Sequence, residues 1–95
     1  MFIVMLTYKV SLDVLNEHLA AHRAYLGEGY QKDYLVASGP RIPKTGGILL
    51  SQLKDRATLE KFISNDPFKV NGIADYEIIE FEPVKYHQKF AEFIE

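Results

Sequence analysis

The chain of 95 residues contains no cysteine, which excludes a disulfide framework and thiolate chemistry and is typical of a reducing compartment. It has no run of lysine or arginine and carries a formal net charge of −2, so it lacks the basic surface that binds nucleic acid. The apolar opening from Met1 to Leu6 has no basic flank and is too short for a signal sequence or a membrane span. We therefore expect a soluble, cytoplasmic protein that binds neither nucleic acid nor membranes.

Aromatic residues, in contrast, are plentiful. Six Phe and six Tyr make up 13% of the chain. One domain of this length has a thin core, which does not easily cover so many large rings. Some of them should therefore line a pocket or a contact between subunits, and we expect a homodimer or a higher homo-oligomer.

Strand-forming runs and helical periodicity alternate along the chain. The expected strands are residues 2–8, 34–38, 48–53 and 74–81. The first helix should run from about Leu12 to Gly27 or Tyr30, where Gly27 and Gly29 loosen its end. Gly39 and Pro40 should stop the second strand and open a loop that reaches residue 47. Asp55 should cap a second helix, and Asp66, in front of Pro67, should cap a short segment that ends near Gly72.

This order predicts an α+β, ferredoxin-like βαββαβ fold, with a four-stranded antiparallel sheet and two helices on one of its faces. The strand 74–81 is apolar on both sides, so the other face of the sheet needs a cover, which a second copy could supply. Residues 1–83 would form the domain. Residues 84–95 would form an extension with a short amphipathic helix, because Tyr86, Phe90 and Phe93 have helical spacing.

His22 is the first candidate for chemistry. It shares a helical face with Leu15, Leu19 and Leu26, where an imidazole needs a partner. It could be a general acid/base in a half-buried pocket, or a core histidine whose hydrogen bonds are satisfied by its neighbours.

Asp66 is the natural second candidate. A carboxylate beside His22 would fix the tautomer of the imidazole and favour its charged form. The same residue could instead be an ordinary helix cap in front of Pro67. Both roles are compatible, because a carboxylate has two oxygens.

Ser38, Gly39, Pro40 and Arg41 form a third candidate group at the end of the second strand. Gly39 would let the backbone approach a ligand, Ser38 could donate a hydrogen bond and Arg41 could hold an oxyanion. The alternative is a turn that ends the strand, with an arginine in solvent.

Metal and cofactor signatures are weak. His18 and His22 have the i, i+4 spacing of metal ligands, but Glu17 precedes His18 and no third ligand is evident, so the H-E-x-x-H pattern is absent. Gly46-Gly47 is only a pair of glycines and does not form a phosphate loop or a dinucleotide fingerprint. We expect neither a metal nor a cofactor.

Four short motifs occur together in the chain. They are His22-Arg23-Ala24-Tyr25-Leu26, Ser38-Gly39-Pro40, Gly46-Gly47, and Asp66-Pro67-Phe68 with Gly72-Ile73-Ala74. With this set the chain resembles the YciI-like (YCII-related) family over about residues 1–83. Asp33-Tyr34 stands where that family commonly has a glycine turn, and the tail after Pro83 continues beyond the family's usual end.

The resemblance implies the dimeric α+β barrel form of the ferredoxin-like fold, in which the sheets of two subunits face each other. It also implies a pocket that contains His22 and Asp66 and is lined by Ser38 to Pro40. Members of the family are usually described as candidate enzymes, with lyase or isomerase chemistry on small, often ring-derived compounds.

Our leading hypothesis is a cofactor-independent enzyme for elimination or isomerisation of a small acidic molecule. His22 would move the proton, Asp66 would orient it, and Ser38 with Arg41 would hold the substrate. A non-catalytic dimeric module that binds a small molecule in the same pocket is the alternative. A third hypothesis is an interaction protein whose aromatic tail recruits a partner.

Overall fold

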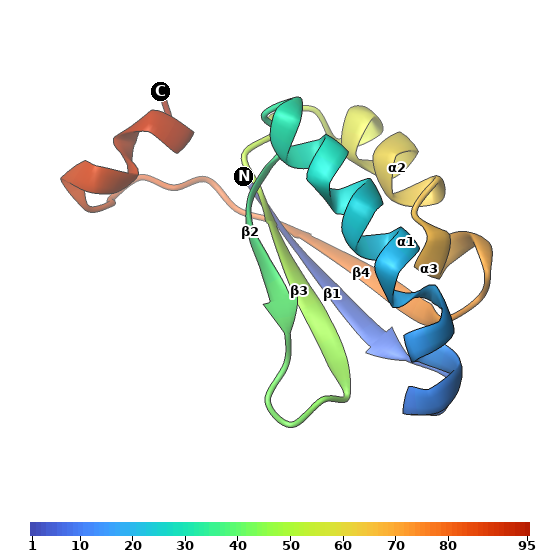
Figure 1. The fold of residues 1–95 in the computed structure, drawn as a ribbon. Coiled ribbons are helices and arrows are strands. Elements are labelled where there is room, and N and C mark those ends of the chain that lie inside the picture. The colour runs from blue at the N-terminus through green and yellow to red at the C-terminus, as the bar shows by residue number, and fades with distance from the viewer.

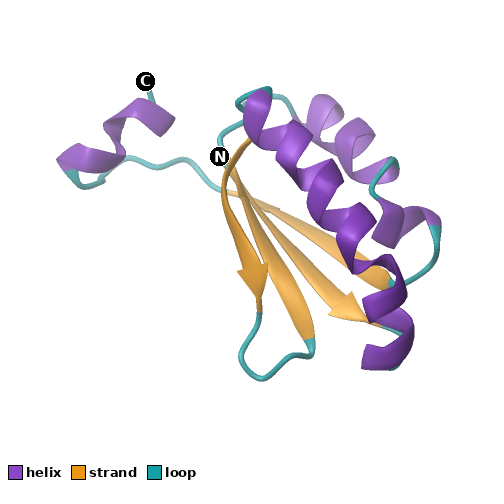
Figure 2. Ribbon diagram, in the orientation of Figure 1, coloured by secondary structure: helices purple, strands orange, loops and turns teal.

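The computed structural model describes all residues from 1 to 95 and has two layers, a sheet and a layer of helices on one of its faces (Figures 1 and 2). The strands are β1 (Phe2–Tyr8), β2 (Leu35–Pro40), β3 (Gly46–Ser51) and β4 (Ala74–Glu80), and the helices are α1 (Leu12–Gln31), α2 (Arg56–Ser64), α3 (Pro67–Val70) and the 3-10 helix η1 (Gln88–Phe93). All strand pairs are antiparallel, in the order β2-β3-β1-β4. The predicted ferredoxin-like fold is confirmed.

Side-chain alternation along β1 explains how the sheet packs. Phe2, Val4 and Leu6 are buried, whereas Ile3 and Met5 between them are only partly covered. Because alternate side chains of a strand point to opposite faces, the first set lies under the helices and the second on the open face. The core therefore fills the space between the sheet and the helices.

Helix starts agree with the predicted caps. The side chain of Ser11 accepts a hydrogen bond from the backbone N–H of Val14, and that of Asp55 accepts from Thr58. Asp66 caps α3, with Pro67 at its first position, as predicted. Hydrogen bonding from the Thr58 side chain lowers the pKa of Asp55.

The end of α1 lies one residue beyond Tyr30, the later of the two expected positions. The helix continues through both glycines to Gln31, and Gly29 is buried. A Cβ at Gly29 would stand 2.6 Å from the ring atom Cζ of Phe62, so this glycine allows α1 to pack closely against α2. The chain then turns at Asp33, whose φ of 60° is the left-handed conformation that favours glycine.

The hairpin of β2 and β3 is longer than predicted. Gly39 and Pro40 belong to β2, and Pro40 pairs with Gly47 of β3. β2 is an edge strand, and proline is tolerated there because it has no N–H to donate to a further strand. Gly46 is required in β3, because a Cβ there would collide with the carbonyl oxygen of Leu6.

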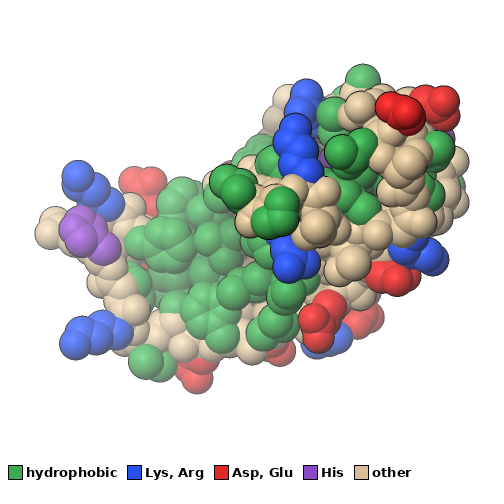
Figure 3. Space-filling view, turned by 90° about the horizontal axis from the view of Figure 1, so that it is seen from below, with side chains coloured by type: hydrophobic (Ala, Val, Ile, Leu, Met, Phe, Trp, Pro, Cys, Tyr) green, Lys and Arg blue, Asp and Glu red, His purple; other side chains and the backbone are tan.

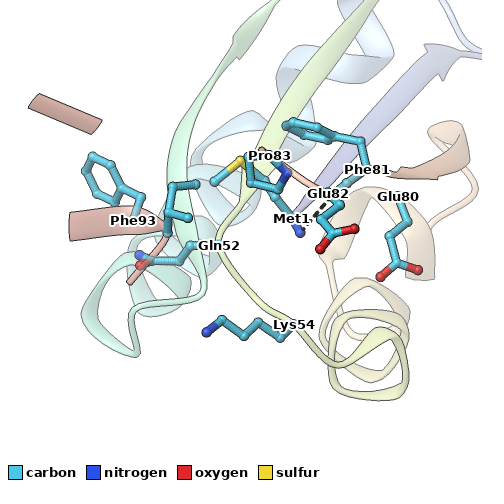
Figure 4. Close-up of a pocket in the computed structure, with 9 residues that line it drawn as sticks. Met1, Gln52, Lys54, Glu80, Phe81, Glu82, Pro83 and Phe93 are labelled. Atoms are coloured by element: carbon cyan, nitrogen blue, oxygen red, sulfur yellow. Dashed lines mark hydrogen bonds between the residues drawn. The ribbon is translucent and has the colours of Figure 1, made fainter. Parts of the chain in front are cut away.

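The C-terminal segment leaves the body of the molecule after β4 (Figure 1). Val84 is 83% exposed. The helix expected in residues 84–95 is only the six-residue η1, in which the rings of Phe90 and Phe93 pack on each other. A hollow of about 620 Å³ lies between this segment and the start of β1 (Figure 4). It is lined by Met1, Gln52, Lys54, Glu80, Phe81, Glu82, Pro83, Phe93 and Ile94.

The open face of the sheet keeps apolar side chains at the surface. Ile79 of β4 is 41% exposed and Phe81, just after it, is 40% exposed. Figure 3 shows hydrophobic side chains gathered in a broad area beside the C-terminal segment. No helix of the structure combines the length and the apolar character that crossing a membrane would require.

Candidate acid/base site

His22 and Asp66, 44 positions apart in the sequence, are in direct contact. The Nδ1 atom of His22 lies 2.7 Å from Oδ1 of Asp66. His22 is 8% exposed and Asp66 only 1%. The α1 helix presents His22 on the face that it packs against the body, and the turn between α2 and α3 brings Asp66 up to it.

Asp66 accepts three hydrogen bonds. Its Oδ1 also accepts from the backbone N–H of Phe68, at 3.0 Å, and its Oδ2 accepts from the hydroxyl group of Tyr76, at 2.7 Å. Because an ionised carboxylate only accepts, the hydrogen that it shares with His22 belongs to Nδ1. Asp66 thus serves as helix cap and as histidine partner at once, the two roles that the sequence left open.

The other ring nitrogen of His22, Nε2, makes no hydrogen bond with the protein. No buried side-chain nitrogen or oxygen lacks a partner, so Nε2 is not buried. His22 lines a cavity of about 340 Å³, whereas Asp66 and Tyr76 do not. An imidazole whose Nδ1–H is fixed by a carboxylate offers its Nε2 lone pair as a base.

The cavity lies between α1 and the strands β1, β2 and β3. Its walls are mostly apolar and comprise Leu6, Tyr8, Leu12, Leu15, Asn16, Leu19, His22, Arg23, Leu26, Ser38, Gly39, Pro40, Lys44, Gly47, Ile48, Leu49 and Phe68. A volume of this size accommodates a small ring compound. The larger hollow beside Pro83 contains no histidine and none of the predicted site residues.

The segment from Ser38 to Pro40 lines the cavity opposite the helix, as the family resemblance implies. The Ser38 hydroxyl group is 2.7 Å from that of Tyr30. Arg41, which we expected to hold an oxyanion, is not part of the cavity wall. Its side chain passes instead beside Gly46, 3.2 Å from where a Cβ on that residue would stand.

Two other cations line the cavity in place of Arg41. Arg23 follows His22 on α1, and Lys44 lies in the loop between β2 and β3. Neither side chain is in an ion pair, and the wall contains no Asp or Glu. In a chain whose net charge is −2, this cavity is a locally positive environment.

Tyrosine hydroxyl groups near the site are poor acids. Burial, and then the hydrogen bond to Asp66, raise the pKa of Tyr76 far above its usual range. Burial likewise raises the pKa of Tyr8, which lines the cavity, and of Tyr25. No three His, Asp or Glu side chains lie close enough together to hold a metal ion.

These features define a ferredoxin-like α+β protein with a buried His–Asp pair at the wall of a small cavity. The chain belongs to the family of the YCII-related domain, whose model matches residues 1–82. Residues 83–95 lie beyond the matched residues.

A solved structure has the same fold. It is 5-chloro-2-hydroxyhydroquinone dehydrochlorinase (TftG) from Burkholderia phenoliruptrix AC1100, in complex with 2,5-dihydroxybenzoquinone. Its TM-score to this chain is 0.70, with 24% sequence identity over 85% of this chain and 93% of that chain. No curated protein sequence matches this chain significantly.

Sequence reasoning missed several residues at the site. Phe68 and Tyr76 both touch Asp66, and Arg23 and Lys44 line the cavity. The sequence could have indicated Tyr76. It shares with Ile78 the face of β4 that packs against the core, and a hydroxyl group there needs a hydrogen-bond partner. No such signal existed for Lys44, because its loop position depends on tertiary structure.

Proposed function

We propose that this protein is a cofactor-independent enzyme that transfers a proton to and from a small, ring-derived acidic molecule, by elimination or isomerisation. The observation that carries the proposal is the contact of 2.7 Å between Nδ1 of His22 and Oδ1 of Asp66. The imidazole ring of the same histidine lines the cavity. One ring nitrogen is held by a buried carboxylate and the other is free for a ligand.

The proposed step begins with the neutral imidazole. Nε2 of His22 takes a proton from an acidic C–H of the substrate, and Asp66 stabilises the resulting imidazolium through Nδ1–H. The electron pair of the broken C–H bond forms a double bond. In an elimination a leaving group departs with its own electron pair, whereas in an isomerisation the imidazolium returns the proton to another atom of the same molecule.

Substrate charge is inferred from the wall of the cavity. Arg23 and Lys44 would attract a carboxylate or an ionised hydroxyl group, and apolar side chains such as Leu15 and Leu19 would cover a ring. Ser38 and the backbone at Gly39 and Pro40 would contact the substrate from the opposite side. Arg41 would need to change conformation to take part.

The structural neighbour supports the choice of reaction. TftG is a dehydrochlorinase, and its complex holds a hydroxylated quinone. Loss of HCl from a chlorinated ring compound is an elimination, and it requires a proton acceptor of the kind that His22 provides. We extend this class of chemistry to the present chain and leave its own substrate to experiment.

The test uses 5-chloro-2-hydroxyhydroquinone as the first probe, with chloride release as readout. Small hydroxylated and carboxylated ring compounds follow, scored by hydrogen–deuterium exchange at carbon in D₂O. We expect His22→Gln to slow the reaction of any active probe by about 10²–10⁴-fold, the usual contribution of a general acid/base. The protein should stay folded, because glutamine can still hydrogen-bond to Asp66.

Two outcomes would contradict the proposal. The first is wild-type turnover in His22→Gln. The second is a probe that raises the melting temperature of both proteins equally and exchanges no hydrogen with either, which would favour the non-catalytic binding module.

We also infer that two copies associate through the open face of the sheet. Ile3, Met5, Ile79 and Phe81 are only partly covered on that face, and a paired sheet would bury them. Ile79→Asp should convert a dimer into a monomer in sedimentation velocity. Val70→Asp is the matched control, because Val70 is an exposed apolar residue of α3. A monomeric wild type would contradict the inference.

A further inference from the structure

Tyr76 has a place in the site that the proposed reaction does not use. It lies on β4 opposite Leu6 of β1, on the side of the sheet that faces the helices. Its hydroxyl group donates a hydrogen bond of 2.7 Å to Oδ2 of Asp66. It does not line the cavity, so it is outside the reach of a bound substrate.

The two oxygens of Asp66 have unequal surroundings. Oδ1 accepts from His22 and from the backbone N–H of Phe68, whereas Oδ2 accepts from Tyr76 alone. The carboxylate is 1% exposed, so water cannot replace a lost donor. A carboxylate without that donor would have to rotate or place more of its charge on Oδ1, the oxygen that faces His22.

We propose that Tyr76 is the positioning residue of this site and fixes the Asp66 carboxylate so that Oδ1 holds His22 in the tautomer with Nε2 free. This inference rests on the proposed acid/base role of His22. Tyr76 acts through Asp66 and touches no reacting atom.

Tyr76 is suited to this task because it keeps its proton. Burial and the hydrogen bond to Asp66 raise the pKa of its hydroxyl group, so it stays a donor throughout the pH range in which the reaction would run. The result is a chain of hydrogen bonds from β4 through the turn before α3 to α1. The sheet thereby sets the angle of an imidazole that is carried by a helix.

The ionisable groups around the pair do not duplicate this contact. The hydroxyl group of Tyr25 donates to the backbone oxygen of Phe62, at 2.6 Å. Tyr8, Arg23 and Lys44 line the cavity and make no hydrogen bond with Asp66.

The experiment compares Tyr76→Phe with Tyr25→Phe by NMR of the His22 ring. Each variant loses one hydroxyl group and one internal hydrogen bond, but only Tyr76 touches Asp66. In Tyr76→Phe we expect the Nδ1–H proton resonance to move downfield. The pH midpoint of the ring titration should rise by about 0.5–1 unit, the equivalent of one hydrogen bond. In Tyr25→Phe both should match wild type.

If the Nδ1–H resonance and the pH midpoint of the His22 ring were the same in Tyr76→Phe and Tyr25→Phe, the proposal would be overturned and Tyr76 would be a purely structural residue. Wild-type protein labelled with 3-fluorotyrosine gives a second measurement that does not depend on the folding of Tyr76→Phe. The fluorinated hydroxyl group is a stronger donor, so the midpoint should fall, and an unchanged midpoint would also overturn the proposal. Neither readout needs turnover, so failure of the proposed enzyme activity would be seen separately.

Discussion

The imidazole of His22 lies parallel to the phenyl ring of Phe68, with ring centroids 3.8 Å apart and an interplanar angle of 1°. Phe68 is itself buried, and its backbone N–H donates to Asp66. A single residue therefore supports both members of the His–Asp pair, one through its ring and the other through its backbone. The short helix α3 is the part of the fold that assembles the site.

Phe68→Leu should separate these two forms of support. Leucine keeps the backbone N–H but loses the ring, so we expect the free energy of unfolding to fall by about 0.5–1.5 kcal/mol and the His22 ring to become more mobile. Urea unfolding and NMR relaxation of the ring measure the two effects. Phe62→Leu is the control, since Phe62 stacks on Tyr25 instead. Unchanged His22 mobility in Phe68→Leu would contradict the role of the stack.

Arg23 and Lys44 should make the cavity selective for anions. Benzoate and benzamide have similar shapes but differ in charge, and we expect benzoate to bind more tightly. Arg23→Gln or Lys44→Gln should each weaken benzoate binding by about two- to fivefold, as for a solvent-exposed ion pair, with little effect on benzamide. Titration by NMR measures both ligands.

Arg41→Gln is the matched control for that prediction. Arg41 has the same charge but does not line the cavity, so benzoate binding should be unchanged. Loss of benzoate binding in Arg41→Gln alone would reinstate the assignment made from the sequence.

The two glycines near the end of α1 should respond in opposite directions to alanine. A Cβ at Gly27 meets nothing within 4 Å, so Gly27→Ala should stabilise the helix by about 0.5–1 kcal/mol. A Cβ at Gly29 would clash with the ring of Phe62, so Gly29→Ala should destabilise the protein by about 1–3 kcal/mol. Chemical denaturation checks both values, and equal effects would refute the close packing of α1 on α2.

Alkaline pH should weaken the fold through Tyr76. Its pKa is raised in the folded protein, and in the unfolded chain it returns to about 10. Above that pH the unfolded state loses a proton that the folded state keeps, so stability falls as pH rises, by about 1.4 kcal/mol per pH unit for this group. Unfolding curves between pH 9 and 11 should be correspondingly less pH-dependent in Tyr76→Phe. Equal pH dependence in both proteins would argue against a pKa of Tyr76 raised by burial and by the hydrogen bond to Asp66.

Local patterns in the sequence were sufficient for the order of strands and helices and for the helix caps. A shared place for His22 and Asp66 was implied by the family resemblance, and the residues alone left their contact open. Alternation in residues 2–8 and the caps at Ser11, Asp55 and Asp66 depend on neighbours in the chain, and the structure agrees with them. The roles of Gly29 and Pro40 were predicted wrongly. Gly29 is needed for the close contact of α1 with Phe62 of α2, and Pro40 can belong to β2 because β2 is an edge strand. Arg41 was chosen by its proximity in sequence, whereas the direction of its side chain depends on the register of β2 with β3.

Asp66 caps a helix and holds the imidazole with one and the same oxygen, Oδ1. A substitution there would therefore leave three donors without a partner in the core, those of His22, Phe68 and Tyr76. Variants at this position should be scarce in cells, because quality control removes chains that unfold. Selection for abundance alone would then preserve the carboxylate, with or without the proposed reaction.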